Sequence, residues 1–237
     1  MKIPAIYEVG DYFFVWKPNN IPTTFWKNKS FIEELVWLSK IVKKDLLDRV
    51  QEKFFSLVEK LGYNIDSFLL NRLDNDTGWL LYFAKSKEAF GKFKDLQSKE
   101  KIEKIYLCDV WLKRPKNILN KLENRLKRKD NYFLIDYPIA HHKFVKEKMV
   151  VIKTEKDKNK VRWKFHYVKT LLRPLYIDNN IVTFEVVIFK GIRHQIRAHL
   201  SSIWLSILWD KLYWVKLENQ NSDDILHLRS IGLRFND

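Results

Sequence analysis

The sequence predicts an α+β fold in which a mixed, mainly antiparallel central sheet carries flanking helices. Two observations predict this class. Apolar residues recur at helical spacing in separate stretches of the chain. Other stretches show the alternation of apolar and polar residues that is typical of strands with one buried face. No internal repeat and no linker rich in Pro, Gly or Ser divides the chain, so we expect a single domain over residues 1–237.

The first part of the chain is predicted to begin with a strand and to continue as helix. Residues 11–24 (DYFFVWKPNNIPTT) suit a strand followed by a proline-punctuated loop. Residues 30–61 show helical periodicity, and Ser30 with Glu33 suits a capping box at the start of this stretch. A further helix is predicted over residues 86–99 from its apolar stripe.

The second part of the chain is richer in strands. The clearest strand is predicted over residues 181–190, where apolar residues occupy every second position. Gly191 ends this run, and residues 195–203 again show helical spacing. The other strand-like runs are residues 104–110, 145–153 and 165–172.

The chain carries a strong positive charge. It has 44 Lys and Arg against 29 Asp and Glu, a formal net charge of +15. Such an excess favours a polyanionic partner, because cations that neutralise phosphates release counterions. Residues 113–129 and 143–164 are the most basic stretches. The alternative for both stretches is a solvated surface that serves solubility alone.

The composition also narrows the class of protein. The single cysteine, Cys108, excludes an intrachain disulfide and a multi-cysteine metal site, and we expect it in the core. No apolar run approaches about 18 residues, so no membrane span is expected. The first residues lack a signal-peptide pattern. We therefore expect a cytoplasmic protein.

Three segments carry the candidate chemistry. They are residues 71–78 (NRLDNDTG), 104–107 (KIYL) and 191–200 (GIRHQIRAHL). In this order and at these separations they resemble the RLD-x-x-T, K-x-Y and HQIR-x-H signatures of the RluA family of RNA pseudouridine synthases. Lys17-Pro18, residues 210–213 and Leu226-His227 resemble flanking segments of the same family, so the resemblance extends from about Tyr12 to Phe235.

The resemblance implies the pseudouridine synthase catalytic fold, without the S4-like RNA-binding domain that often precedes it. It also implies a reaction in which the N1–C1′ bond of uridine breaks and uracil is rejoined through C5. A carboxylate suits the sugar side of this reaction, either by attack on C1′ or by removal of a proton from C2′. By resemblance Asp74 is that carboxylate. A capping Asp in a turn is the alternative.

The resemblance implies two further catalytic residues. Arg197 matches the arginine that keeps the catalytic carboxylate ionised through a bidentate grip. Its alternative is a surface ion pair. Tyr106 matches the aromatic platform for the everted base, and its alternative is a core tyrosine. The predicted catalytic set is therefore Asp74, Tyr106 and Arg197.

Other motif residues are implied in RNA binding. Arg193 is assigned to the RNA backbone, whereas His194 and Gln195 either bond phosphates or orient their loop. The residues predicted to bind RNA are Arg72, Lys104, Arg193, His194 and Gln195.

The resulting prediction is an isomerase that acts on uridine in structured rRNA or tRNA. The isomerisation is redox-neutral, so we expect no metal and no cofactor, and His141-His142 lacks the spacing and partners of a zinc site. We expect a monomer without a membrane partner. A non-catalytic RNA-binding protein that kept the fold is the main alternative. A hydrolase of glycosidic bonds is favoured only by the presence of Asp74 and Asp76.

The sequence departs from the family pattern in two ways. Asn71 stands where the family usually has His, and Ile192 where it usually has Arg. The chain also has nine Trp and only six Gly. Tryptophan stands at four positions where the family pattern has glycine, namely Trp79, Trp204, Trp209 and Trp214. One hypothesis is that these are glycines encoded by UGA and read through the wrong genetic code. The alternative is an aromatic surface that stacks on bases.

Overall fold

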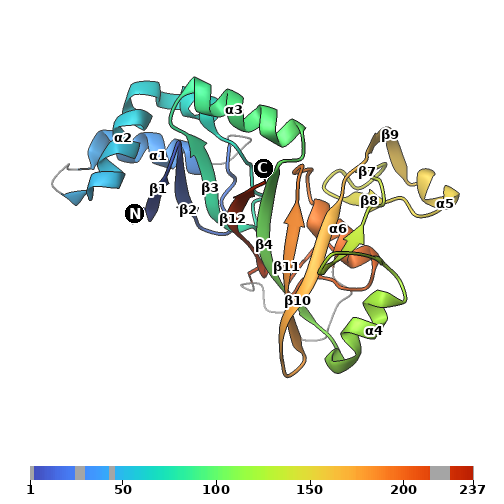
Figure 1. Ribbon diagram of the computed structural model, residues 1–237. Coiled ribbons are helices and arrows are strands. Elements are labelled where there is room, and N and C mark those ends of the chain that lie inside the picture. The colour runs from blue at the N-terminus through green and yellow to red at the C-terminus, as the bar shows by residue number, and fades with distance from the viewer. Residues whose placement is uncertain (1–2, 25–29, 43–45, 214–224, 237) are drawn as a thin grey trace. The chain divides into compact units, whose positions relative to one another are not determined.

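In a computed structural model the chain forms two compact units, Met1–Lys99 and Glu100–Asp237 (Figure 1). The structure describes residues 3–24, 30–42, 46–213 and 225–236. Helices and antiparallel strand pairs occur in both units, which confirms the predicted α+β class with a mainly antiparallel sheet. That residues 1–237 act as one domain stays a prediction.

The first unit contains three antiparallel strands, with β2 (Tyr12–Lys17) between β1 (Ile6–Val9) and β3 (Gly78–Ala84). Its core joins sheet and helix through aromatic rings. The ring of Phe54, which is fully buried, lies 5.4 Å from the ring of Phe13 and 5.4 Å from that of Phe83. The helices of this unit, which Figure 1 shows beside the sheet, are α1 (Phe31–Ile41), α2 (Arg49–Leu61), η2 (Gly62–Phe68) and α3 (Lys87–Ser98).

The helical stretch predicted over residues 30–61 contains two helices, α1 and α2. The capping box of α1 is confirmed. The Ser30 side chain accepts from the Glu33 backbone N–H at 3.2 Å, and the Glu33 carboxylate accepts from the Ser30 N–H at 2.7 Å. A second cap starts α2, because Asp48 accepts from two backbone N–H groups at 2.8 Å.

The second unit is built on the pairing of β4 (Ile102–Trp111) with β11 (Ile181–Ile188). On its other edge β4 pairs with β12 (Leu228–Phe235). The sheet continues from β11 in the order β10 (Thr170–Asp178), β6 (Tyr132–Ile135) and β5 (Lys127–Lys129). The remaining helices of this unit are η3 (Pro115–Asn117), α4 (Ile118–Glu123), α5 (Glu155–Lys158) and α6 (Gln195–Ser202).

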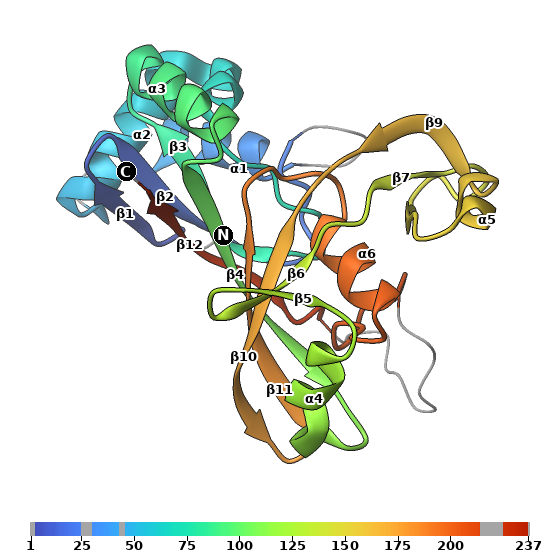
Figure 2. The same ribbon diagram turned by 45° about the vertical axis from the view of Figure 1, so that its right-hand side comes forward.

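A small antiparallel sheet with β7 (Ile139–His142) between β8 (Met149–Val151) and β9 (Val161–His166) packs near α6. Figure 2 shows α6 beside this sheet. Ile139 and Met149 of the small sheet share a buried apolar cluster with Ala198 of α6 and with Tyr213. This cluster fixes α6, which carries the third motif, against the small sheet.

The predicted elements agree with the structure where the periodic pattern extends over many residues, and they differ where it covers only a few. The elements predicted at 86–99, 104–110, 181–190 and 195–203 are confirmed by α3, β4, β11 and α6. Residues 145–153 are strand only over Met149–Val151, because Lys148 N–H bonds to the Val145 carbonyl at 3.0 Å in a turn. Residues 165–172 span the end of β9 and the start of β10, so the apolar run passes from one sheet to another. In the part of the chain that the structure describes, no helix is long and apolar enough to cross a membrane.

Candidate active site

Asp74 lies in the loop between η2 and β3 of the first unit and is partly buried. The loop closes on itself, since the Thr77 N–H donates to the Asp74 carbonyl at 3.0 Å. Leu73 is fixed by Thr23, whose hydroxyl donates to the Leu73 carbonyl at 2.9 Å and accepts from its N–H at 3.2 Å. The carboxylate of Asp74 is thus carried by a backbone that is bonded on both sides.

Lys17, the last residue of β2, is fully buried and lies under this loop. Its ammonium donates to the carbonyls of Thr77 at 2.8 Å, Pro18 at 2.9 Å and Asn75 at 3.4 Å. Burial lowers the pKa of Lys17 to about 8, while the charge of Asp74 acts in the opposite direction. At pH 7 the side chain therefore stays positive. Because Coulomb attraction is mutual, this cation favours the ionised form of Asp74.

The strand that follows the loop needs a glycine at its first position. A Cβ added to Gly78 would lie 2.2 Å from the Asn19 side-chain oxygen. The Asn19 amide itself donates to the Asp76 carbonyl at 2.6 Å. On the other side Asn71 donates to the Leu80 carbonyl at 3.2 Å and accepts from the Tyr82 N–H at 2.8 Å. Asn71, a departure from the family pattern, therefore ties the motif to β3.

Arg72, predicted to bind RNA, is exposed and forms an ion pair with Asp66 at 3.2 Å. An exposed pair of this kind contributes little to stability, so RNA phosphates could replace Asp66 at low cost. RNA contact by Arg72 stays a prediction.

Tyr106 and Lys104 lie on β4 in the second unit, and both are buried. Tyr106 stands opposite Val186 on β11 and opposite Ser230 on β12, next to a register shift in β12. The Lys104 ammonium would lie 3.9 Å from a Cβ added to Gly191. The second motif and the start of the third are therefore neighbours.

Arg197 projects from α6 into a buried ion pair with Asp210. Its Nε and Nη2 donate to the two carboxylate oxygens, each at 2.8 Å, and both side chains are almost wholly buried. Asp210 also accepts from the Leu212 and Tyr213 N–H groups at 3.1 Å. The guanidinium lies 5.4 Å from the Tyr213 ring centroid. The alternative of a surface ion pair for Arg197 is wrong, because the pair is buried. The observed bidentate grip is on Asp210, whereas the expected one was on the catalytic carboxylate, and the role of Arg197 in keeping Asp74 ionised stays a prediction.

His194 and Gln195 hold the start of α6 through bonds within the protein. His194 has a left-handed backbone (φ 52°), and a ring nitrogen lies 3.2 Å from the Tyr213 hydroxyl. Burial and the charges of Arg197 and Arg193 lower the pKa of His194 to about 3, so it is neutral at pH 7. The Gln195 amide donates to Thr170 at 3.1 Å and to the Lys169 carbonyl at 3.0 Å. These bonds support the loop-orienting alternative, and phosphate contact by either residue stays a prediction.

The turn that carries Asp210 is fastened to β4 and to the segment before β12. The Leu208 N–H donates to the Asp109 carbonyl at 2.8 Å, and the His227 N–H donates to the Leu208 carbonyl at 3.1 Å. The Asp109 carboxylate accepts from Thr183 at 2.6 Å, from His227 at 3.0 Å and from Arg229. Asp109 and Asp210 were not among the predicted site residues, and the only signal for this turn was that residues 210–213 and 226–227 resembled flanking segments of the family.

The structure thus describes two groups of motif residues, one in each unit. The first presents a carboxylate, and the second presents an arginine and a buried tyrosine. Cys108 is buried as expected. Among the described residues no group of His, Cys, Asp and Glu is arranged to hold a metal ion.

Comparisons with known proteins give a consistent picture. A family model described as RNA pseudouridylate synthase matches residues 11–202. A protein of Aquifex aeolicus (strain VF5) described as an uncharacterized RNA pseudouridine synthase is 30% identical over 148 residues, which cover 62% of this chain and 40% of the relative. A protein of Helicobacter pylori (strain J99) with the same description is 26% identical over 157 residues, which cover 64% of this chain and 55% of the relative. The matches thus span about half the length of these curated relatives or less.

Solved structures share the fold. Human RNA Pseudouridylate Synthase Domain Containing 1 matches with a TM-score of 0.60 at 17% identity over 98% of this chain and 78% of that chain. Human RNA Pseudouridylate Synthase Domain Containing 4 matches with a TM-score of 0.58 at 18% identity over 96% of this chain and 82% of that chain. At these identities the likeness concerns the fold alone.

Proposed function

Because the chain belongs to the RNA pseudouridylate synthase family, we propose that it isomerises uridine to pseudouridine in RNA. The family is the one expected from the three motifs. The observation that supports activity most directly is the loop of Asp74, which holds a partly buried carboxylate above the buried ammonium of Lys17.

The reaction balances without any other reactant. The N1–C1′ bond breaks, a C5–C1′ bond forms, and the proton that leaves C5 is replaced by one on N1. Asp74 serves the sugar side, either by attack on C1′ or by taking a proton from C2′. Both routes need the ionised carboxylate, which the charge of Lys17 favours.

Tyr106 and Arg197 complete the proposed catalytic set through their match to the family motifs. Tyr106 stacks on the everted uracil, which recovers about 1–3 kcal/mol of the cost of unstacking. Arg197 supplies a guanidinium whose orientation is set by Asp210 before substrate binds. Preorganisation of this kind lowers the cost of ordering charged groups in the transition state.

The proposed substrate is structured RNA, either ribosomal or transfer RNA. The net charge of +15 supports a polyanionic substrate. Arg72, Lys104 and Arg193 are the proposed cationic contacts, and His194 and Gln195 shape the loop that carries Arg193.

The test uses RNA labelled with tritium at C5 of uridine. We expect the protein to release tritium and the Asp74→Asn variant to lose this release by about 10²–10⁴-fold or more, the usual contribution of a positioned acid or base. Asp95→Asn is the matched control, since it makes the same charge change at an exposed pair with Lys99. It should leave the rate unchanged.

The rival function, RNA binding without chemistry, gives a different result. Tight binding by the wild type with no tritium release from ribosomal or transfer RNA would overturn the proposed activity. So would a rate that Asp74→Asn leaves intact.

A further inference from the structure

The small sheet of the second unit contains a bulge that lies opposite one histidine. Ala140 pairs with Phe165 and His142 pairs with Val161, so the single residue His141 of β7 stands opposite three residues of β9, and β9 is the bulged strand. Ile139 packs toward α6, while Ala140 packs into a separate apolar cluster with Val161. A bulge re-aims the side chains it carries, and here the bulged stretch includes the exposed Arg162, opposite the partly buried imidazole of His141.

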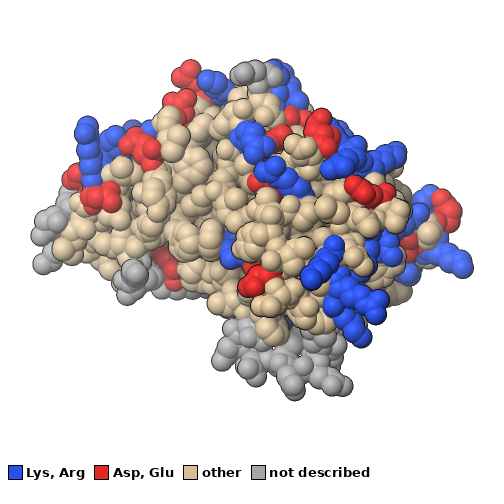
Figure 3. Space-filling view, turned by 60° about the horizontal axis from the view of Figure 1, so that its bottom comes forward, with Lys and Arg blue, Asp and Glu red and all other residues tan. Residues whose placement is uncertain are grey.

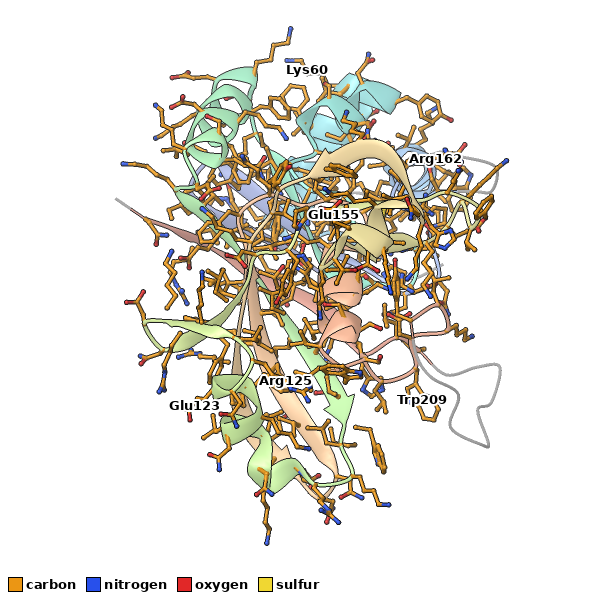
Figure 4. The ribbon with its side chains drawn as sticks, turned by 90° about the vertical axis from the view of Figure 1, so that its right-hand side faces the viewer. Lys60, Glu123, Arg125, Glu155, Arg162 and Trp209 are labelled. Carbon is orange, nitrogen blue, oxygen red and sulfur yellow. The ribbon has the colours of Figure 1, made fainter. Side chains whose placement is uncertain are left out.

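Two arginines and a second histidine, from two elements, lie around this imidazole. The pKa of His141 is lowered by burial and by the charges of Arg193, His166 and Arg162. Arg162 and His166 belong to β9, and Arg193 belongs to the loop before α6. Figure 4 labels Arg162 on β9. Like charges held close together are unfavourable unless an anion binds between them.

Two acidic residues that precede β9 in the sequence pair with neighbouring lysines. Glu155 pairs with Lys158 at 2.7 Å, and Asp157 pairs with Lys160 at 3.2 Å. These pairs belong to α5 and the turn after it. Figure 3 shows many Lys and Arg side chains in the right-hand half of the view, with several acidic ones among them. Arg162 and Arg193 thus supply the positive charge beside the two histidines, whose pKa values burial lowers.

We propose that His141, Arg162, His166 and Arg193 form a binding surface for consecutive phosphates of the RNA strand. The inference rests on the proposed function, since the RNA is the same substrate, and it adds three residues that the motifs do not include. Arginine suits this role because its planar fork matches phosphate oxygens. The two imidazoles add hydrogen-bond donors, and a bound phosphate stabilises their protonated forms.

The test compares Arg162→Gln with Arg128→Gln. Both remove one exposed arginine of the second unit, and Arg128 pairs with Glu123 at 3.3 Å on β5, outside the proposed surface. Binding to a labelled ribosomal RNA fragment is measured by fluorescence anisotropy in the Asp74→Asn background, with the salt concentration varied. We expect Arg162→Gln, but not Arg128→Gln, to weaken binding several-fold and to reduce the salt slope by about 1.

The outcomes separate this surface from the proposed activity. If the wild type binds RNA through this surface but releases no tritium, the activity fails and the surface stands. Equal effects of Arg162→Gln and Arg128→Gln on RNA affinity would overturn the surface. Unchanged RNA affinity together with lost binding to polyglutamate would also overturn it, and would indicate an acidic protein as partner.

A second inference comes from the backbone of three tryptophans. Trp79, Trp204 and Trp209 have φ values of 83°, 64° and 59°. This left-handed region is strained for an L-residue with a bulky side chain, whereas glycine adopts it freely. Asn, Asp and His, which tolerate the region better, account for most of the other described non-glycine residues with positive φ.

Trp204 stands at the glycine position of a Schellman motif that ends α6. Its N–H donates to the Ser201 carbonyl at 3.1 Å, and the Leu205 N–H donates to the Leu200 carbonyl at 2.9 Å. This is the paired bonding that requires a left-handed residue, most often glycine, directly after the helix. Trp209 has the same backbone conformation one residue before Asp210.

Display of aromatic rings does not explain these conformations. The Trp204 indole is 69% exposed and lies 4.1 Å from the Arg125 guanidinium, a contact that a ring on ordinary backbone could also make. Trp16 and Trp111, which stand on β2 and β4, have no positive φ. The strained tryptophans are those that coincide with glycine in the family pattern.

We infer that residues 79, 204 and 209 are glycines in the natural protein, encoded by UGA in an organism that reads this codon as glycine. Trp214, which belongs to the same hypothesis, lies outside the described residues. Figure 4 labels Trp209 near the end of the described part of this segment.

The gene and the natural protein provide the test. UGA at codons 79, 204 and 209, with glycine in the corresponding peptides by mass spectrometry of protein from its own cells, would support the inference. UGG at these codons would overturn it. In the recombinant protein with tryptophan, Trp204→Gly should raise the melting temperature by about 2–4 °C through relief of backbone strain. The control Trp111→Gly should lower it, and the opposite pattern would contradict the inference.

Discussion

The guanidinium of Arg197 is almost wholly buried, and a buried cation is stable only with a well-placed partner. Asp210 provides that partner, and its carboxylate also accepts hydrogen bonds from the Leu212 and Tyr213 N–H groups. The Tyr213 hydroxyl in turn accepts from the Met149 N–H at 2.7 Å. The orientation of the proposed catalytic arginine therefore depends on a chain of contacts that reaches β8.

Asp210→Asn should damage both stability and turnover. The amide cannot neutralise Arg197, and breaking a buried pair from one side costs about 3–5 kcal/mol. Urea unfolding measures the loss, and Asp178→Asn, at an exposed end of β10, is the control. Arg197→Lys keeps the positive charge but loses the two parallel hydrogen bonds of the guanidinium. This variant should therefore have a higher free energy of unfolding than Asp210→Asn but a lower kcat than the wild type. A stability equal to wild type in Asp210→Asn would contradict this account.

Individual site residues could be predicted from the sequence where they belong to a short motif. Asp74, Tyr106 and Arg197 stand in motifs whose spacing is visible in the sequence, and their roles are proposals that mutation can test. The partners of these residues were harder to find. Asp210 follows Arg197 by thirteen residues, and only the turn fastened by Asp109 and His227 brings the carboxylate back to α6. Pairings that depend on a tertiary turn leave no periodic signal.

At the scale of elements, the end of β2 supports the loop before β3. Lys17 lies on β2 and bonds three backbone carbonyls, two of them in the loop that carries Asp74. Strand pairing places Lys17 opposite Trp79, so the same register that builds the sheet positions the ammonium. The position of the loop is thus a property of the β2–β3 pair rather than of the motif alone.

The pKa of Lys17 gives this arrangement a pH dependence. Its pKa falls from 10.5 in the unfolded chain to about 8 in the folded state because of burial. Below pH 8 both states hold the proton, and the folded state bears the whole cost of the buried charge. Between about 8 and 10.5 the unfolded state binds more protons, so the free energy of unfolding rises with pH. The gain amounts to roughly 3 kcal/mol in total.

Lys17→Met removes this titration. The wild type should therefore gain stability relative to Lys17→Met as pH rises from 7 to 10.5, although the variant is less stable at pH 7 because its loop carbonyls lose their donor. Urea unfolding of both proteins across this range measures the difference. Parallel stability curves would show that Lys17 titrates normally and that its charge is not held under the loop.

Long elements were predictable from the sequence and short ones were not. The capping box of α1 and the apolar pattern of β11 correctly located this helix and this strand. In each element several residues favour the same secondary structure. β5 and β8 have three residues each, too few to show a period. They are strands only because neighbouring strands bond them, and β12 is paired with a segment more than a hundred residues away.

At the scale of the whole molecule, the fold class followed from periodicity, while the two compact units did not. A linker-free chain with no shift in composition gives no sign of the division at Lys99, which is defined by which contacts the folded chain makes. The charge of the chain is different in kind. It can be read directly from the sequence, and it predicts how the protein responds to ions regardless of the details of any single contact.

RNA binding should depend strongly on salt. With a net charge of +15, contacts to about six phosphates are a reasonable expectation, and such contacts would weaken binding by about 10³-fold between 50 and 200 mM monovalent salt. Anisotropy titrations of the Asp74→Asn protein against one RNA at several salt concentrations give the slope. Because the release of counterions is additive, removing both Arg162 and Arg193 should reduce the slope by about 2. A slope near zero would mean that bases and shape, rather than phosphates, dominate the affinity, and the basic stretches would then serve only solubility.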